Sequence, residues 1–97
     1  MTTKVIGLIQ LNDPEAFEEY RSQVGNTVAL YQGKIISRGS LNAFFWNELN
    51  CDSFSAFVEL EFPDLEHSQS WANSPEYQSL LAIRSKAMKL TLFSVSV

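Results

Sequence analysis

Arg84 is the residue whose type and position most directly suggest chemistry. It follows Tyr77 by seven positions and Leu81 by three, so in a helix its side chain falls within an apolar stripe. A guanidinium is seldom buried alone, because removing an unpaired charge from water is costly. Arg84 could anchor an anion or carboxylate at the edge of a cavity, or it could form a structural ion pair or extend to solvent. We expect its guanidinium to be largely removed from water and to contact a carboxylate, with Glu61 or Glu59 as the first candidates.

Glu59 and Glu61 form a second candidate pair. They alternate with Leu60, so in a strand they share the face opposite to Leu60. Two neighbouring carboxylates could raise the pKa of one of them and supply a general acid or base. The structural alternative, which we favour, pairs them with Arg38 or Lys34 on the adjacent strand of a hairpin.

The other residues that could take part in chemistry have simpler structural explanations. Trp71 and Tyr77 flank the break at Ser74-Pro75 and could stack on a ligand, but packing the two helical pieces together is the favoured interpretation. His67 and Cys51 are single, which excludes a disulfide within the chain and predicts no zinc site. No glycine-rich phosphate loop is present. We expect no metal and no organic cofactor, and the sequence assigns no catalytic residue.

The composition favours a small domain over residues 1–97 that associates with a partner. Of the 97 residues, 45% are hydrophobic and 12% aromatic, which is more apolar material than a small core needs. The 7 basic residues are scattered among 11 acidic ones, so we expect no nucleic-acid binding. No apolar run approaches the ~20 residues that span a bilayer, and no signal peptide is recognisable, so we expect no membrane association and a cytoplasmic location.

The elements that must position these residues follow from periodicity and capping signals. Alternating patterns predict strands over residues 4–11, 34–39, 56–62 and 90–97. Helical patterns predict a helix over 13–33, a short helix over 64–72 and a second piece over 75–89. We expect Gly25-Asn26 to bend or break the first helix and Gly33 to cap it. Residues 40–53 are predicted as strand ends around a loop.

This order predicts an α+β fold. Two β-α-β units with right-handed crossovers, joined by a hairpin, give a ferredoxin-like β-α-β-β-α-β arrangement with an antiparallel sheet. Both helices should cover one face. The first strand is apolar on both faces, however, with Val5 and Ile9 on one and Ile6 and Leu8 on the other. A second copy packed sheet to sheet would cover the bare face, so we expect a two-fold symmetric homodimer.

Several short segments together carry a family resemblance. They are Asp13-Pro14-Glu15-Ala16-Phe17 with Tyr20-Arg21, Ser37-Arg38-Gly39, Leu60-Glu61-Phe62-Pro63, and Trp71 with Ser74-Pro75-Glu76-Tyr77-Gln78 and Arg84. In this order the chain resembles domain-of-unknown-function family 1330 of the dimeric α+β barrel superfamily, whose members include antibiotic-biosynthesis monooxygenases and muconolactone isomerase. The family usually has a glycine-rich hairpin and then an arginine before the third strand, whereas residues 47–55 here contain neither. The resemblance implies the fold and the dimer but no agreed activity.

The leading hypothesis is a homodimer that binds a small molecule in a cavity between sheet and helices. It could be a cofactor-independent enzyme acting on a small anionic or aromatic metabolite. The alternatives are a non-catalytic ligand-sensing or structural dimer, and a monooxygenase- or isomerase-like enzyme by analogy with the superfamily. An open pocket holding Arg84 and a carboxylate would favour binding, and a filled core would favour structure. The candidate ligand-binding residues are Arg84, Arg38, Glu61, Tyr77, Glu59 and Trp71.

Overall fold

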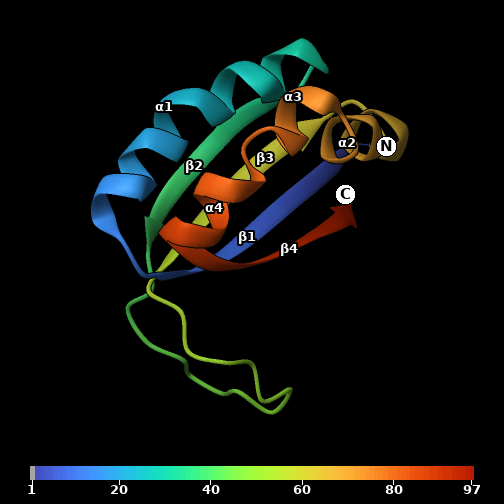
Figure 1. Cartoon of the computed structure of the whole chain (residues 1–97). Coiled ribbons are helices and arrows are strands. Elements are labelled where there is room, and N and C mark those ends of the chain that lie inside the picture. Colours follow the sequence, from blue (N-terminus) through green and yellow to red (C-terminus); the bar gives the residue numbers. More distant parts are fainter. Residues whose placement is uncertain (1) are drawn as a thin grey trace.

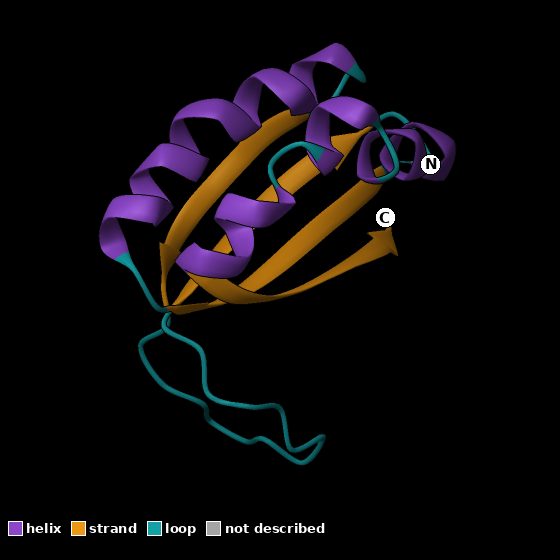
Figure 2. Ribbon diagram, viewed as in Figure 1, coloured by secondary structure: helices purple, strands orange, loops and turns teal. Residues whose placement is uncertain are grey.

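A four-stranded antiparallel sheet forms one layer of the molecule, and helices form the other (Figures 1 and 2). The computed structural model describes residues 2–97. Its elements are β1 (Thr3–Leu11), α1 (Pro14–Leu30), β2 (Lys34–Ser40), β3 (Ala56–Phe62), α2 (Leu65–Ala72), α3 (Pro75–Gln78), α4 (Leu81–Ala87) and β4 (Met88–Ser96). The strand order is β2-β3-β1-β4, so the first and third strands are central. The predicted ferredoxin-like α+β fold is confirmed.

Helix α1 begins as the sequence predicts but is not broken at Gly25. The Asp13 side chain caps the helix by accepting the amide hydrogens of Glu15 and Ala16, at 3.0 and 3.2 Å. The helix then continues without interruption to Leu30. A glycine inside a helix costs only about 1 kcal/mol relative to alanine. The buried face of α1 holds the helix together across Gly25, so the predicted break was wrong.

The end of α1 also differs in detail from the prediction. The residue with left-handed backbone is Gln32, with φ 65°, and not Gly33. Gly33 donates its amide hydrogen to the Val28 carbonyl at 3.0 Å. A Cβ atom at Gly33 would lie 2.5 to 2.8 Å from ring atoms of Phe62. Glycine is therefore needed here for close packing against the sheet.

The second helical region is more divided than predicted. Asp64 caps α2 and Ser74 caps α3, as their positions before Leu65 and Pro75 suggest. The piece predicted over 75–89 consists of α3 and α4, separated by a turn at residues 79–80. Tyr77, Leu80 and Ala87 are all buried. The turn allows these three side chains to reach the core together, and β4 begins earlier than predicted, at Met88. Among the described residues, no helix is both long and apolar enough to cross a bilayer.

The two faces of the sheet have different environments. Val5, Leu60 and Phe62 are buried beneath the helices, together with Trp71 and Tyr77. The opposite face is called the bare face here, because none of the described helices covers it (Figure 1). It carries the side chains that alternate with the buried ones along β1, β3 and β4, which are Lys4, Ile6, Leu8, Gln10, Phe57, Glu59, Glu61, Lys89, Thr91, Phe93 and Val95.

Residues 41–55 form a long loop between β2 and β3 that projects from one end of the sheet (Figures 1 and 2). We call it the arm. Its base is joined by a hydrogen bond from the Leu41 amide to the Ser55 carbonyl at 3.0 Å. The strands predicted to extend into this segment end at Ser40 and begin at Ala56, so most of the segment is loop.

Candidate functional site

A cavity of about 330 Å³ lies between α1 and the helix-facing side of the sheet. We call it the α1 cavity. Its lining is mainly apolar and includes Ile9, Phe17, Val24, Ile35, Leu60 and Trp71. The space arises partly because Ser40 and Ala56, which are paired across β2 and β3, are both small and also line the cavity. Larger residues at these two positions would fill the space beneath the first half of α1.

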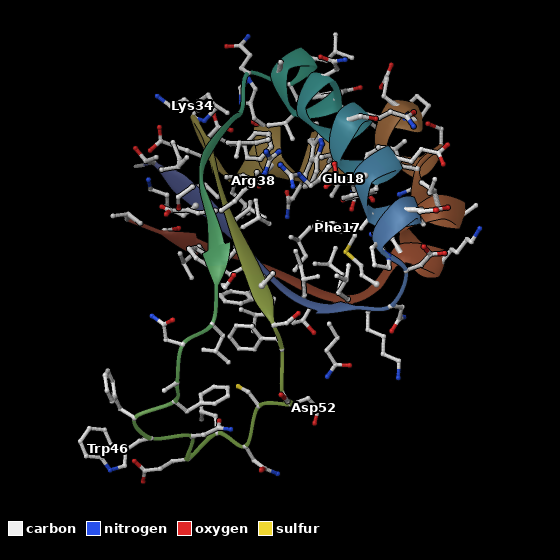
Figure 3. All side chains as sticks on the ribbon, turned by 90° about the vertical axis from the view of Figure 1, so that its left-hand side faces the viewer. Phe17, Glu18, Lys34, Arg38, Trp46 and Asp52 are labelled. Carbon is white, nitrogen blue, oxygen red and sulfur yellow. The ribbon has the colours of Figure 1, made fainter. Side chains whose placement is uncertain are left out.

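Two arginines line the cavity from opposite walls. Arg21 comes from α1, where it contacts Glu18 at 3.2 Å and lies 6.0 Å from the centre of the Phe17 ring. Arg38 comes from β2, and Figure 3 shows it directed toward α1. Within the described part of the chain, Arg38 has no carboxylate partner. The cavity therefore combines an apolar interior with two guanidinium groups, one of them paired with Glu18, and this combination suits an amphiphilic anion.

Arg84, Tyr77 and Tyr20 form a row of hydrogen bonds beside the cavity. Arg84 donates through Nη1 to the Tyr77 hydroxyl at 3.0 Å, and the hydroxyl oxygens of Tyr77 and Tyr20 are 2.9 Å apart. Burial, reinforced by Tyr77, raises the pKa of Tyr20 well above its ordinary value. Tyr20 therefore stays protonated and can act as a hydrogen-bond donor but not as a base.

The same row leaves one phenol proton without an acceptor. Only one of the two hydroxyl protons can occupy the bond between Tyr20 and Tyr77, and the described residues offer no acceptor for the other. Leaving a buried donor unpaired costs about 1–3 kcal/mol. Tyr20 lines the cavity and Tyr77 does not. The arrangement of lower energy therefore has Tyr77 donating to Tyr20, whose own proton is available to water or to a ligand.

The predicted contact between Arg84 and a carboxylate was wrong. Arg84 is on the helix side of the sheet, whereas Glu59 and Glu61 lie on the bare face, so the sheet separates them. Arg84 is instead partly buried and bonded to the neutral hydroxyl of Tyr77. Helical spacing places Arg84 correctly in the apolar stripe, but it carries no information about which side chain from another element meets it.

Glu59 and Glu61 form ion pairs with lysines, as the structural interpretation predicted, but their main partner is Lys4, which was not predicted. Lys4 lies 3.2 Å from Glu59 and 2.9 Å from Glu61, and Lys34 lies 3.3 Å from Glu61. Lys34 was predicted as a partner and Lys4 was not, although Lys4 shares the face of Ile6 and Leu8. Arg38, the other predicted partner, points to the opposite side of the sheet.

These ion pairs argue against the catalytic alternative for Glu61, in which a raised pKa would make it a general acid or base. The hydrogen bond from Lys4 lowers the pKa of Glu61 below its ordinary value of 4.5, with a further contribution from Lys34 that burial partly offsets. The same contacts, first with Glu61 and then with Glu59, raise the pKa of Lys4. Glu61 is therefore ionised at neutral pH, and its position outside the α1 cavity separates it from the other candidates.

Trp71 has a structural role and also lines the cavity. Its indole nitrogen donates to the Thr27 hydroxyl at 3.0 Å, and its ring centre lies 4.4 Å from that of Tyr77. The predicted packing of Trp71 against Tyr77 is therefore present. Of the six candidate residues, Arg38 and Trp71 line the cavity, Tyr77 and Arg84 support it from behind, and Glu59 and Glu61 lie elsewhere.

The sequence did not suggest Arg21 as a site residue, and for Tyr20 a place in a pocket was considered but a core or interface position was favoured. Tyr20 belongs to the same apolar stripe as Phe17 and Val24, and Arg21 follows Phe17 by four positions, which places it at the margin of that stripe. This spacing could have indicated a cation beside the helix-facing pocket. Among the described residues, no group of three or more His, Cys, Asp or Glu side chains could hold a metal ion.

Comparison with known proteins agrees with this fold. The model of the family described as "Domain of unknown function (DUF1330)" matches residues 4–97. No curated protein matches the sequence. The RPA0582 protein of unknown function from Rhodopseudomonas palustris superposes with a TM-score of 0.78 at 16% identity, covering 99% of this chain and 82% of that one.

Two further solved structures share the fold at low identity. A dimeric ferredoxin-like protein of unknown function from Thermobifida fusca gives a TM-score of 0.69 at 16% identity, covering 100% of this chain and 92% of that one. SnoaB, a cofactor-independent oxygenase from Streptomyces nogalater, gives a TM-score of 0.69 at 10% identity, covering 99% of this chain and 92% of that one. These likenesses establish the fold only. The family match spans nearly the whole sequence, and the chain therefore belongs to the DUF1330 family.

Proposed function

We propose that this protein is a homodimer in which each subunit binds a small, largely apolar molecule with an anionic group in the α1 cavity. The observation that carries this proposal is the pairing of Arg21 and Arg38 across an apolar space of about 330 Å³. That volume lies within the range of about 300–1,000 Å³ typical of small-molecule sites. The apolar lining would hold the body of the ligand, and the arginines would hold its carboxylate.

Tyr20 gives the site a third polar contact. Its spare proton would be donated to an oxygen of the ligand, while Arg84, acting through Tyr77, fixes the direction of that proton. Arg84 and Tyr77 would then act as positioning residues rather than ligand contacts. This arrangement favours ligands with an oxygen acceptor over hydrocarbons of the same size.

The bare face supports the homodimer. Ile6, Leu8, Phe57 and Phe93 lie on it, and the described structure leaves Phe93 42% exposed. Most charges on the same face are matched, because Lys4 and Lys34 pair with Glu59 and Glu61, and the exposed Lys89 lies at one end of the face, near the start of β4. The central part of this face could be buried against a second copy without leaving a charge unpaired. The solved relatives described as dimeric agree with this proposal.

Binding is favoured over catalysis by the chemistry of the lining. The described cavity lining contains no Asp, Glu, His, Cys or Lys, and Tyr20 stays protonated. It therefore offers donors and positive charge but no general base. An oxygenase activity like that of SnoaB is the alternative enzyme reading, and it rests on the shared fold.

The proposal is tested by thermal shift with matched ligand pairs. Aromatic and medium-chain carboxylic acids should raise the melting temperature, and their primary amides should raise it much less. Arg38→Gln and Arg21→Gln should each weaken acid binding by roughly 10- to 100-fold, the range expected for one charge-assisted hydrogen bond. Lys86→Gln is the control, because Lys86 is an exposed cation on α4 outside the cavity. Equal stabilisation by acids and amides, or an unchanged affinity in both arginine variants, would show the site to be wrong. Oxygen uptake with a bound acid would favour the enzyme alternative.

A further inference from the structure

The arm exposes three large apolar side chains near its tip. Phe45, Trp46 and Leu49 are 91%, 83% and 91% exposed, more than the other large hydrophobic residues of the described chain. Aromatic residues of this kind are enriched in protein interfaces, and an exposed apolar group on a polar loop marks an interaction site. The α1 cavity does not involve these residues, so they need a separate explanation.

The arm is attached to the bare face. Gln10, which shares that face with Leu8, donates a hydrogen bond from its side chain to the Ser53 carbonyl. The returning part of the arm, residues 51–54, lines a hollow together with Leu8 and Thr91 of the same face. Figure 3 shows Trp46 on the side of the sheet opposite α1. The arm therefore projects from the end of the sheet on the side of its bare face, which is the side on which the proposed homodimer places the second copy.

The tip of the arm is held in a hydrogen-bonded turn. The Asn47 side chain both donates to the Cys51 carbonyl at 3.0 Å and accepts from the Cys51 amide at 2.9 Å. Asn50 has φ 59°, which closes the turn together with its bond to the Asn47 carbonyl at 3.0 Å. A preformed turn loses less conformational entropy on binding than a flexible loop does. Trp46 immediately precedes this turn and Leu49 lies within it, so both side chains belong to an ordered segment.

From these observations we propose that the arm is a dimerisation arm, whose Phe45, Trp46 and Leu49 pack onto the second copy beside its bare face. This inference rests on the homodimer of the proposed function and adds a second contact region to the sheet-to-sheet interface. A lipid surface suits the arm less well. Glu48 and Asp52 are its only charged residues, and it contains no lysine or arginine, so anionic headgroups would repel it.

Fluorescence quenching tests the arm directly, because Trp46 is one of two tryptophans and the other, Trp71, is 1% exposed. In the wild-type dimer at micromolar concentration, iodide should quench Trp46 several-fold less than in the monomer. The monomer is obtained by dilution or by Phe93→Lys on the bare face. The difference between wild type and Trp46→Phe isolates the signal of Trp46.

Sedimentation then measures the strength of the dimer. Trp46→Ser and Leu49→Ser should each raise the dimer dissociation constant at least ten-fold. Leu30→Ser is the matched control, because Leu30 is a leucine with 65% exposure at the end of α1 and should leave the constant unchanged.

The outcomes separate the two proposals. A wild-type monomer in light scattering would overturn the homodimer and the arm contact together. A stable dimer with freely quenched Trp46, and with unchanged dissociation constants in both serine variants, would overturn the arm alone. A blue shift of Trp46 on addition of phosphatidylcholine–phosphatidylglycerol vesicles, with co-sedimentation of the protein, would identify the arm as a membrane contact and overturn the proposal.

Discussion

Arg84 donates to the hydroxyl of Tyr77 over 3.0 Å, and its guanidinium carbon lies 5.7 Å from the centre of the same ring. One arginine thus uses a single tyrosine both as a hydrogen-bond acceptor and as an aromatic surface. The contact satisfies a partly buried cation without a carboxylate, because the guanidinium keeps part of its hydration.

Replacement of Arg84 should therefore have a moderate effect. We expect Arg84→Ala to lower the free energy of unfolding by about 1–2 kcal/mol, since it removes one charge-assisted hydrogen bond and the packing over Tyr77. Urea denaturation measures this, with Lys86→Ala on the same helix as a control that should change stability by less than about 0.5 kcal/mol. A loss of about 3–5 kcal/mol would instead indicate that Arg84 belongs to a buried ion pair, which would contradict the contact with Tyr77 described above.

The hydrogen bond between Trp71 and Thr27 should be a sensitive point of the core. Thr27→Val keeps the shape of the side chain but leaves the buried indole N–H without its acceptor. We expect a loss of about 1–3 kcal/mol, the usual penalty for an unsatisfied buried donor. Thr27→Ser restores the acceptor and should be the more stable of the two variants in chemical denaturation. A valine variant as stable as the wild type would mean that the bond contributes nothing.

Gly33 and Gly25 should respond to alanine in opposite directions. A Cβ at Gly33 would overlap the ring of Phe62, which is itself only 1% exposed and cannot move away easily. At Gly25 the nearest atom to such a Cβ is the Ile35 Cδ1 at 3.6 Å, an ordinary contact. We expect Gly33→Ala to destabilise by about 1–3 kcal/mol through overpacking and Gly25→Ala to stabilise by about 0.4–1 kcal/mol. Melting temperatures that move in the same direction would contradict this.

The loss of folding stability at low pH should depend on Glu61. Its pKa is below 4.5 in the folded chain because of Lys4 and Lys34, while the unfolded chain has the ordinary value. The folded state therefore releases this proton more readily. The stabilisation is complete above about pH 4.5 and is lost as the pH falls through the lowered folded pKa. The wild type should thus lose stability more steeply than Glu61→Gln below pH 4.5. Carbon-detected NMR titration of the Glu61 carboxyl should give a midpoint below that value, and a midpoint above it would contradict the ion-pair account.

Local signals in the sequence were sufficient for most of the framework. Asp13-Pro14 and Ser74-Pro75 placed two helix starts correctly, because a capping side chain and a proline act on their immediate neighbours. The alternation in 56–62 gave both the limits of β3 and the faces of its side chains. The break predicted at Gly25 is absent because the cost of a glycine inside a helix, about 1 kcal/mol, is smaller than the free energy gained when a long amphipathic helix packs on the core.

The candidate site was harder to predict from the sequence than the fold, because it depends on the distances between helices and strands. Arg38 was among the candidates and lines the cavity, but its face was assigned wrongly, since the register shift between Ile35 and Ser37 changes the alternation along β2. The cavity itself results from small residues that face each other across two strands, and such an absence of side-chain volume has no periodic signal. The exposed tip of the arm was visible in sequence as an apolar run, but its orientation was not.

The pairing of β1 with β4 affects how the chain can fold. Thr3 is paired with Ser96 and Leu11 with Met88, so this ladder joins segments near opposite ends of the described chain. Closing so long a loop must precede the gain in free energy from the contacts, and this slows folding relative to a fold built from local contacts. Until β4 docks, β1 has an unpaired edge beside apolar residues such as Ile6 and Leu8. The partly folded chain should consequently be the form most prone to aggregation, and refolding yield should fall with protein concentration even where the native state is stable.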